Sequence, residues 1–290
     1  MALKTVVIPP EADGMKAGLF LRRILPDLPE SALRKLFAAR DVRLDSVRVQ
    51  KDSPVRAGQE LRVYLPDAGR SGSPLRVVYE DGDVLLVNKP AGVSVESDGS
   101  GALSLAELCR LYTAEKDPSA FPPLPCHRLD NKTSGLCLFA KNGQALGILE
   151  EAFRERTVEK YYVCLVRGIP KPPSAECRAF LLKDAARGKV RILDREVPGA
   201  RPVITAYETL EGGPVSRLRV HLVTGRTHQI RAHLAALGHP VLGDDLYGDR
   251  SFNRQMKARG LKLCAVSLRV STGGRLPLLD GKTFEIQPPF

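Results

Sequence analysis

Short apolar runs, separated by turns, are the feature that most constrains the fold of this chain. Residues 84–87 are a candidate for a buried strand, and at 217–222 charged and apolar side chains alternate as in a half-exposed strand. Helical spacing is rarer and marks residues 143–156 and 229–237, the second of which ends at Gly238. This mixture has no regular alternation of strands and helices. It therefore predicts an α+β domain on a mixed, largely antiparallel sheet with flanking helices and loops.

A run of turn-forming residues divides the chain. Residues 66–74 read PDAGRSGSP, and apolar patterning lies on both sides of them. We therefore expect a small domain at residues 1–66, a linker at 67–74 and a larger domain at 75–290.

The small domain has its own pattern of helices and strands. Residues 18–26 and 30–40 place apolar side chains at helical spacing, with arginine and lysine mainly between them. Residues 41–49 and 58–66 alternate as strands do. A small α+β domain with basic outer faces is the expected result.

The charge of the chain indicates a polyanionic partner. There are 44 Lys and Arg against 33 Asp and Glu, a net charge of +11, and the pI is about 9.5. Residues 1–66 hold 12 Lys and Arg against 8 Asp and Glu, net +4, which leaves 32 against 25, net +7, for the remainder. Clustered cations gain affinity for nucleic acid by displacing counterions from phosphates. By itself the charge fits a solvated basic face equally well.

The cysteines and the apolar content suggest a cytoplasmic protein. Six cysteines are scattered without a CxxC pair, in a chain long enough to fold without disulfides, so we expect them to be reduced and mostly buried. No run of about 18 apolar residues occurs, and the N-terminal residues lack an apolar segment of signal-peptide length.

The segment HRLDNKTSG, residues 127–135, is the most unusual stretch of the chain. Arg128 and Asp130 bracket one apolar residue, and a Thr-Ser-Gly turn then leads into the apolar strand 136–140. A loop at the start of a strand can hold a carboxylate over a cleft. The residues alone also allow Asp130 to cap a turn or to pair with Arg128.

A second cluster occupies residues 224–248, where a strand turns into a helix that contains Arg226, His228, Arg231 and His233. A helix N-terminus flanked by arginines suits a phosphate or a carboxylate. A zinc site is the competing interpretation. His228 and His233 lie five residues apart, about 140° around a helix, and so do not share a face as ligands at i and i+4 would.

Other cofactor classes lack their sequence signals. Pro125 and Cys126 have no second cysteine three positions later, and no H-x-E occurs, so the pattern of a zinc nucleobase deaminase is incomplete. A P-loop and a dinucleotide-binding glycine pattern are also missing. We expect no metal, nucleotide or redox cofactor.

HRLDNKTSGLCLFAK resembles the signature of the RluA-type RNA pseudouridine synthases. Four more segments follow the order of that family: EDGDVLLVNKPAGVSVES, EKYYVCLVRG, TGRTHQIRAHLAALGHPVLGDDLYG and LKLCAVSLRV. The resemblance covers residues 75–290, and the small domain resembles the RNA-binding fold named after ribosomal small-subunit protein four. Cys264 stands where relatives often have histidine.

The resemblance implies an enzyme that isomerises uridine in structured rRNA or tRNA to pseudouridine without a cofactor. Asp130 would be the catalytic carboxylate, acting on the sugar as a base or as a nucleophile, with Arg226 as its ion-pair partner. Tyr162 would stack on the detached uracil, and its oxygen is the candidate acceptor of the C5 proton. Tyr161 would face away.

The resemblance also assigns the RNA-facing residues. Arg128 would fill the hole that the flipped base leaves. His228 and Arg231 would position phosphate or the active loop, and Lys160 and Lys89 would support the site. We expect a monomer with RNA as its partner and no membrane. The alternative is an RNA-binding or ribosome-assembly protein that keeps the fold without turnover.

Overall fold

The computed structural model describes residues 2–25, 30–65, 75–99, 103–184 and 188–290. The expected linker at 67–74 lies outside the described residues. The chain divides into two compact units, Met1–Arg76 with Val93–Pro123, and Val77–Gly92 with Leu124–Phe290. We call these the first and the second unit. Residues 93–123 thus group with the N-terminal part of the chain.

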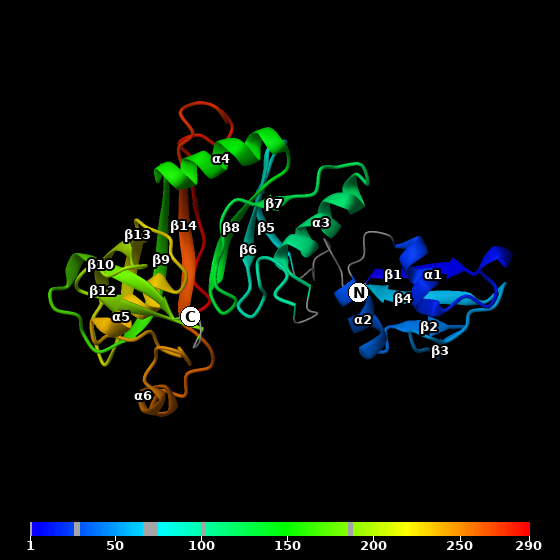
Figure 1. The fold of residues 1–290 in the computed structure, drawn as a ribbon, viewed down its shortest axis with the longest axis horizontal. Helices are drawn as coiled ribbons and strands as arrows, with labels where there is room; N and C mark the ends of the chain where they lie inside the picture. The colour runs from blue at the N-terminus through cyan, green and yellow to red at the C-terminus, as the bar shows by residue number, and fades with distance from the viewer. Residues whose placement is uncertain (1, 26–29, 66–74, 100–102, 185–187) are drawn as a thin grey trace. The chain divides into compact units, whose positions relative to one another are not determined.

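The first unit holds a four-stranded sheet of order β1-β4-β2-β3 with antiparallel neighbours. Its elements, drawn from blue to teal in Figure 1, are β1 (Ala2–Val7), η1 (Pro10–Ala12), α1 (Ala17–Ile24), α2 (Glu30–Ala38), β2 (Val42–Leu44), β3 (Val47–Arg48), β4 (Glu60–Leu65) and α3 (Leu105–Lys116). A core of Phe20, Leu21, Leu33, Val42 and Leu61 joins α1 and α2 to the sheet. The two helices expected in residues 18–40 are therefore present, and β4 lies where the strand at 58–66 was expected. The strand expected at 41–49 is instead the antiparallel pair β2 and β3, which turns at Asp45 and Ser46.

Helix α3 was not expected from the sequence, although a local signal for it exists. The Ser104 hydroxyl accepts a hydrogen bond from Glu107 N, and the Glu107 carboxylate accepts one from Ser104 N at 2.7 Å. This capping box satisfies two backbone N–H groups at the start of the helix.

The second unit is organised by one large sheet, which Figure 1 shows with β9 and β14 near its middle. The strand order is β11-β10-β12-β13-β9-β14-β8-β6-β5, with β15 on β14 and β7 on β8. The strands are β5 (Arg76–Glu80), β6 (Val84–Lys89), β7 (Leu124–Pro125), β8 (Ser134–Ala140), β9 (Val158–Arg167), β10 (Ser174–Asp184), β11 (Lys189–Leu193), β12 (Arg201–Glu211), β13 (Val215–Leu222), β14 (Leu263–Val270) and β15 (Thr283–Glu285).

The pairing of β14 with β8 is parallel, and the other pairings recorded between described strands of this sheet are antiparallel. The expected fold class, α+β on a mixed and largely antiparallel sheet, is confirmed. Strand β8 has neighbours on both edges and is buried along its whole length. The segment 127–133 therefore leads directly into a buried, central strand of the sheet.

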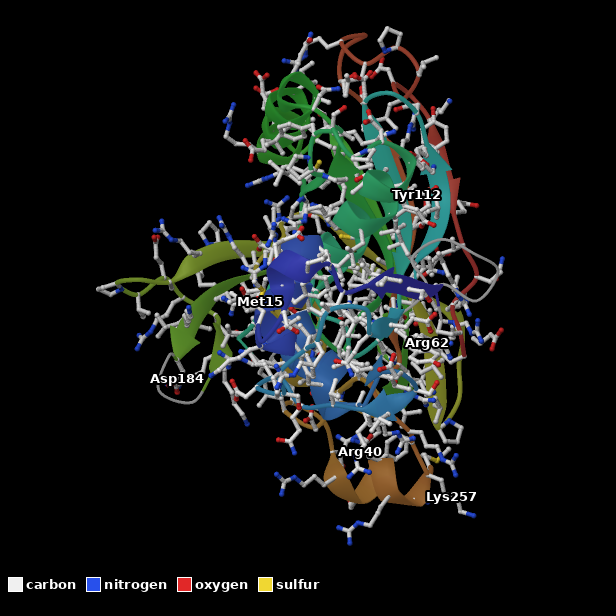
Figure 2. The ribbon with its side chains drawn as sticks, turned by 90° about the vertical axis from the view of Figure 1, so that its right-hand side faces the viewer. Met15, Arg40, Arg62, Tyr112, Asp184 and Lys257 are labelled. Atoms are coloured by element: carbon white, nitrogen blue, oxygen red, sulfur yellow. The ribbon has the colours of Figure 1, made fainter. Side chains whose placement is uncertain are left out.

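Three helices accompany this sheet, α4 (Gly143–Glu155), α5 (Gln229–Ala236) and α6 (Arg250–Gln255). Helix α4 begins at Asn142, whose side chain accepts a hydrogen bond from Ala145 N at 2.8 Å, and it packs Leu149 and Ala152 into a core with strand residues such as Leu138. Ala232 of α5 packs against a separate cluster from β10 to β12. Figure 2 shows Asp184 at the outer end of β10 and Lys257 just past α6. Within the described ranges, no helix is both long and apolar enough to cross a membrane.

Candidate active site

The loop between β7 and β8 holds Asp130 by its backbone. Thr133 N donates to the Asp130 carbonyl oxygen at 3.0 Å and closes the turn. The carbonyl oxygen of the next residue, Asn131, accepts from Gly92 N at 2.8 Å and from Lys89 Nζ at 2.9 Å. The Asp130 side chain remains about one-fifth exposed. A carboxylate on a fixed backbone thus reaches a partly open surface.

Gly135, the last residue of the HRLDNKTSG segment, explains why this turn ends in glycine. Its φ is +118°, and a Cβ atom built on it would lie 2.2 Å from the carbonyl oxygen of Ala265 on β14. Any side chain here would collide with the neighbouring backbone. The glycine therefore lets β8 start close against β14, directly after the Asp130 loop.

Arg231 and Asp244 form a buried ion pair that aims one N–H group at Asp130. Arg231 donates from Nε to Asp244 Oδ2 at 2.7 Å and from Nη2 to Asp244 Oδ1 at 3.0 Å. Its remaining nitrogen, Nη1, donates to Asp130 Oδ2 at 3.2 Å. The side chain of Arg231 is 4% exposed and that of Asp244 is fully buried. A two-point contact of this kind fixes the plane of the guanidinium group, and so the direction of Nη1.

Each member of this ion pair stabilises the charged form of the other. Burial lowers the pKa of Arg231, but the hydrogen bonds and charge of Asp244, and then those of Asp130, raise it above its usual range. Burial also disfavours the Asp244 carboxylate, but Arg231 and the backbone N–H groups of Tyr247 and Leu246 hold its pKa below the usual value. Both groups therefore stay charged at neutral pH.

The ion pair expected between Asp130 and Arg226 is made by Arg231 instead. Arg226 lies in the exposed turn before α5, and no ion pair of its side chain is recorded with the described part of the chain. Arg231 lies in the first turn of α5, where the neighbouring residues are buried as well. A role for Arg226 in catalysis stays a prediction.

Tyr162 lies in the interior beside Asp130. Burial, and then the negative charge of Asp130, raise the pKa of its phenol, so the hydroxyl is protonated at neutral pH. Tyr161 lies elsewhere: its ring stacks on His221 with centroids 4.6 Å apart, and Arg219 lies over it at 4.4 Å. Successive residues of β9 alternate between the two faces of the sheet, so the structure separates the two tyrosines as expected.

The other expected residues have different surroundings. His228 Nε2 lies 3.9 Å from Asp130 Oδ2, and burial lowers the pKa of its ring despite the opposing charge of Asp130. Lys89 is fully buried, and burial lowers its pKa to about 8. Lys160 lies over the Phe153 ring at 5.6 Å, and burial also lowers its pKa. Arg128 is exposed on the same loop as Asp130.

Three residues of the site were not predicted from the sequence: Asp244, Tyr247 and Gln229. Gln229 is buried and holds the turn before α5, since its Oε1 accepts from Arg226 N at 3.1 Å and its Nε2 donates to the Ile204 carbonyl at 3.0 Å. Asp244 and Tyr247 belong to GDDLYG, the last part of the segment 224–248. The sequence signal that could have indicated them is a pair of aspartates and a tyrosine enclosed between two glycines.

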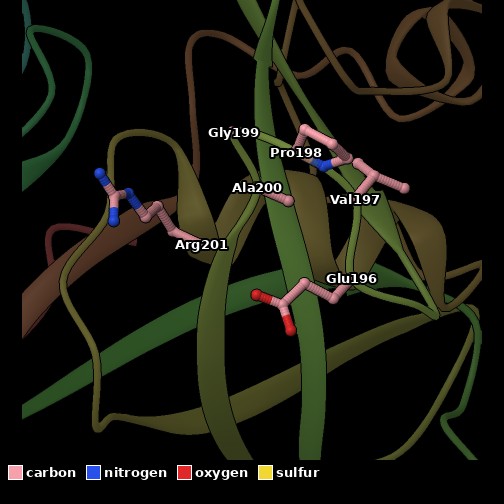
Figure 3. A pocket seen from close by; sticks show the side chains of 6 residues that line it. All are labelled: Glu196, Val197, Pro198, Gly199, Ala200 and Arg201. Atoms are coloured by element: carbon pink, nitrogen blue, oxygen red, sulfur yellow. The ribbon is translucent and has the colours of Figure 1, made fainter.

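Among the described residues, no group of three or more His, Cys, Asp or Glu is arranged to hold a metal ion. One pocket lies in the connection between β11 and β12, where Figure 3 shows its lining of Glu196, Val197, Pro198, Gly199, Ala200 and Arg201. None of the residues that surround Asp130 lines it.

Comparisons with known proteins give similarity over most of the chain. A family model described as RNA pseudouridylate synthase matches residues 83–236. The ribosomal large subunit pseudouridine synthase C of Vibrio vulnificus (strain CMCP6) is 33% identical, with 89% of this chain and 84% of the relative aligned. The protein of the same name from Escherichia coli (strain K12) is 33% identical, with 99% of this chain and 93% of the relative aligned.

Solved structures with this fold are also known. Human RNA pseudouridylate synthase domain containing 1 matches with a TM-score of 0.59 and 32% identity, covering 74% of this chain and 83% of its own. Human RNA pseudouridylate synthase domain containing 4 matches with a TM-score of 0.62 over 74% of this chain and 88% of its own. At 22% identity, this second likeness concerns the fold alone.

Proposed function

This chain belongs to the RNA pseudouridylate synthase family, and we propose that Asp130 is the carboxylate with which it acts on the target uridine. As a member of the family it is an RNA pseudouridine synthase, an isomerase that converts uridine in RNA to pseudouridine. The reaction breaks the bond between C1′ and N1, turns the uracil and joins C1′ to C5. A proton leaves C5 and one is gained at N1, so no atom is lost or added.

The observation that supports Asp130 is the asymmetry of its contacts. Arg231 Nη1 and, farther off, His228 Nε2 both approach Oδ2. No hydrogen bond or ion pair to Oδ1 is recorded from the described residues. One oxygen is thus held by a fixed cation while the other is available to the sugar. It can take a proton from the sugar to set up elimination, or attack C1′ as a nucleophile.

Base flipping and stacking complete the proposal. A stacked uridine cannot reach the carboxylate, so the nucleotide leaves the helix and exposed Arg128 fills the hole. Buried Tyr162, with its neutral phenol, stacks on the detached uracil. For Tyr162 to accept the C5 proton, its hydroxyl would have to give up its own proton in the same step.

The substrate that we propose is rRNA of the large ribosomal subunit, because relatives at 33% identity over 89–99% of this chain bear that description in their names. In this proposal residues 1–66 form an RNA-binding domain, 75–290 form the catalytic domain, and the enzyme works in the cytoplasm as a monomer without a cofactor. The net charge of +11 supports a polyanionic substrate.

The test of Asp130 is Asp130→Asn, which removes the charge and almost no volume. We expect pseudouridine formation in large-subunit rRNA to fall by at least about a thousandfold, with RNA affinity and melting temperature nearly unchanged. The control is Glu151→Gln, since Glu151 is a partly exposed carboxylate of α4 that pairs with Arg275 and with none of the residues described around Asp130. If Asp130→Asn keeps more than a few per cent of wild-type turnover, the assignment is wrong. Mapping pseudouridine in rRNA from cells with and without the gene identifies the target.

A further inference from the structure

Tyr247 joins the β10–β11 hairpin to the site through its hydroxyl group. Val190 N, in β11, donates to the Tyr247 hydroxyl oxygen at 2.9 Å. The same hydroxyl lies 3.0 Å from His228 Nδ1, and His228 Nε2 faces Asp130 Oδ2. The Tyr247 ring also lies beneath the Arg231 guanidinium, whose Cζ is 5.3 Å from the ring centroid. One side chain thus contacts both groups that approach Oδ2.

The hydrogen bonds decide which nitrogen of His228 holds the proton. Because Val190 N–H already donates to the Tyr247 oxygen, the tyrosine's own proton is free to go to His228 Nδ1. The neutral ring then has its proton on Nε2, facing the carboxylate. A charged ring would donate from Nδ1 to the tyrosine oxygen and would also keep a proton on Nε2. The opposite neutral tautomer would place a lone pair against Asp130, which is unfavourable.

The backbone of His228 is strained, which indicates that surrounding contacts hold this residue in place. His228 precedes the first residue of α5 with φ of +55°, in the left-handed region that side chains other than Gly rarely adopt. Such conformations persist where surrounding contacts enforce them, and they concentrate at functional sites. Gln229 and Tyr247 supply those contacts on either side of the turn.

We propose that Tyr247 is a positioning residue that acts through His228. It keeps the proton on Nε2, so that His228 and Arg231 hold the same oxygen of Asp130 and leave Oδ1 to the sugar. The 3.9 Å separation of Nε2 and Oδ2 is longer than a hydrogen bond, and such contacts shorten when a substrate fills the site. This inference rests on the proposed role of Asp130, and it gives His228 a different task from contacting phosphate.

The experiment is a double-mutant cycle with Tyr247→Phe and His228→Asn. Phenylalanine keeps the ring beneath Arg231 and removes only the hydroxyl. Asparagine removes the imidazole and tolerates a positive φ. For Tyr247→Phe we expect kcat to fall by about tenfold and KM to stay within about twofold. The double variant should be no slower than His228→Asn alone, because in this proposal the hydroxyl acts on Asp130 through His228.

The control is Tyr207→Phe, because the Tyr207 hydroxyl donates to the Pro172 carbonyl at 3.0 Å, away from the site, and its loss should leave kcat unchanged. NMR of the histidine ring nitrogens reports the tautomer independently of activity. We expect the proton on Nε2 in the wild type and a mixture of tautomers in Tyr247→Phe.

Normal kcat in Tyr247→Phe, or multiplicative losses in the double variant, would overturn the inference. So would an Nε2 without its proton in the wild type. If instead Asp130→Asn keeps its turnover, the proposed function fails, and this outcome is distinct because the tautomer measurement does not depend on it.

Discussion

Lys89 allows a quantitative test of how the Asp130 loop is held. The lysine is fully buried, and its ammonium donates to the carbonyl oxygens of Pro90 at 3.1 Å and Asn131 at 2.9 Å. Burial, only partly offset by the acidic groups of Cys137 and Asp130, lowers its pKa from 10.5 to about 8. At 1.36 kcal/mol per pKa unit, keeping this lysine charged in the folded state costs about 3 kcal/mol.

The pH dependence follows from the sign of this difference. Between pH 8 and 10.5 the unfolded chain binds a proton that the folded chain has released, so the free energy of unfolding rises with pH in this window. Below pH 8 both states are charged, and the cost is present in full. Lys89→Met removes the titrating group. The stability of the wild type minus that of Lys89→Met should therefore increase by about 3 kcal/mol between pH 7 and 10.5.

Urea unfolding of both proteins at a series of pH values measures this difference, because groups common to both chains cancel. Lys282→Met, at an exposed lysine of the same unit, is the matched control for replacing a lysine by methionine without emptying a buried site. Turnover of Lys89→Met should also fall, because the Asn131 carbonyl next to Asp130 loses an anchor. The reasoning is refuted if the difference in unfolding free energy between the wild type and Lys89→Met stays constant within about 0.5 kcal/mol from pH 7 to 10.5. The cost of burying the charged lysine would then be too small.

Three further predictions concern chemistry and binding. Tyr162→Phe should abolish release of tritium from C5-labelled uridine RNA if the oxygen takes the C5 proton, whereas Tyr161→Phe should release it normally; the reverse result would mean that the wrong tyrosine was chosen. The purified enzyme should keep its activity in excess chelator without added nucleotide or reductant. Loss of activity in chelator that is restored by adding a metal ion would disprove this. Replacing exposed Arg22, Arg23 and Arg34 by Gln should lower the salt dependence of RNA binding by about two in the log–log slope, and an unaltered slope would assign the first unit to another partner.

Much of the local structure was determined by the sequence itself. Helix α4 begins at the predicted Gly143 and ends one residue before the predicted bound, and α5 ends at Ala236, shortly before Gly238 with its φ of +86°. These signals are local, since caps and periodicity depend on neighbours within one or two turns. Five ordered segments, HRLDNKTSGLCLFAK among them, predicted the family and the reaction, and Asp130 lies in the loop just before β8, as its place before the apolar run indicated. The alternation that separates Tyr161 from Tyr162 is local for the same reason.

Only the tertiary structure decided which groups meet at Asp130. Arg226 and Arg231 are both plausible partners in the sequence, but Arg226 lies in the exposed turn before α5 and Arg231 lies in the buried first turn of that helix. The choice depends on contacts between residues about a hundred positions apart, which the sheet order from β12 to β8 brings together. Asp244 and Tyr247 matter only because a fully buried Arg231 needs a charge partner and His228 needs a fixed tautomer. Burial and long-range pairing set these requirements, and no local pattern of residues records them.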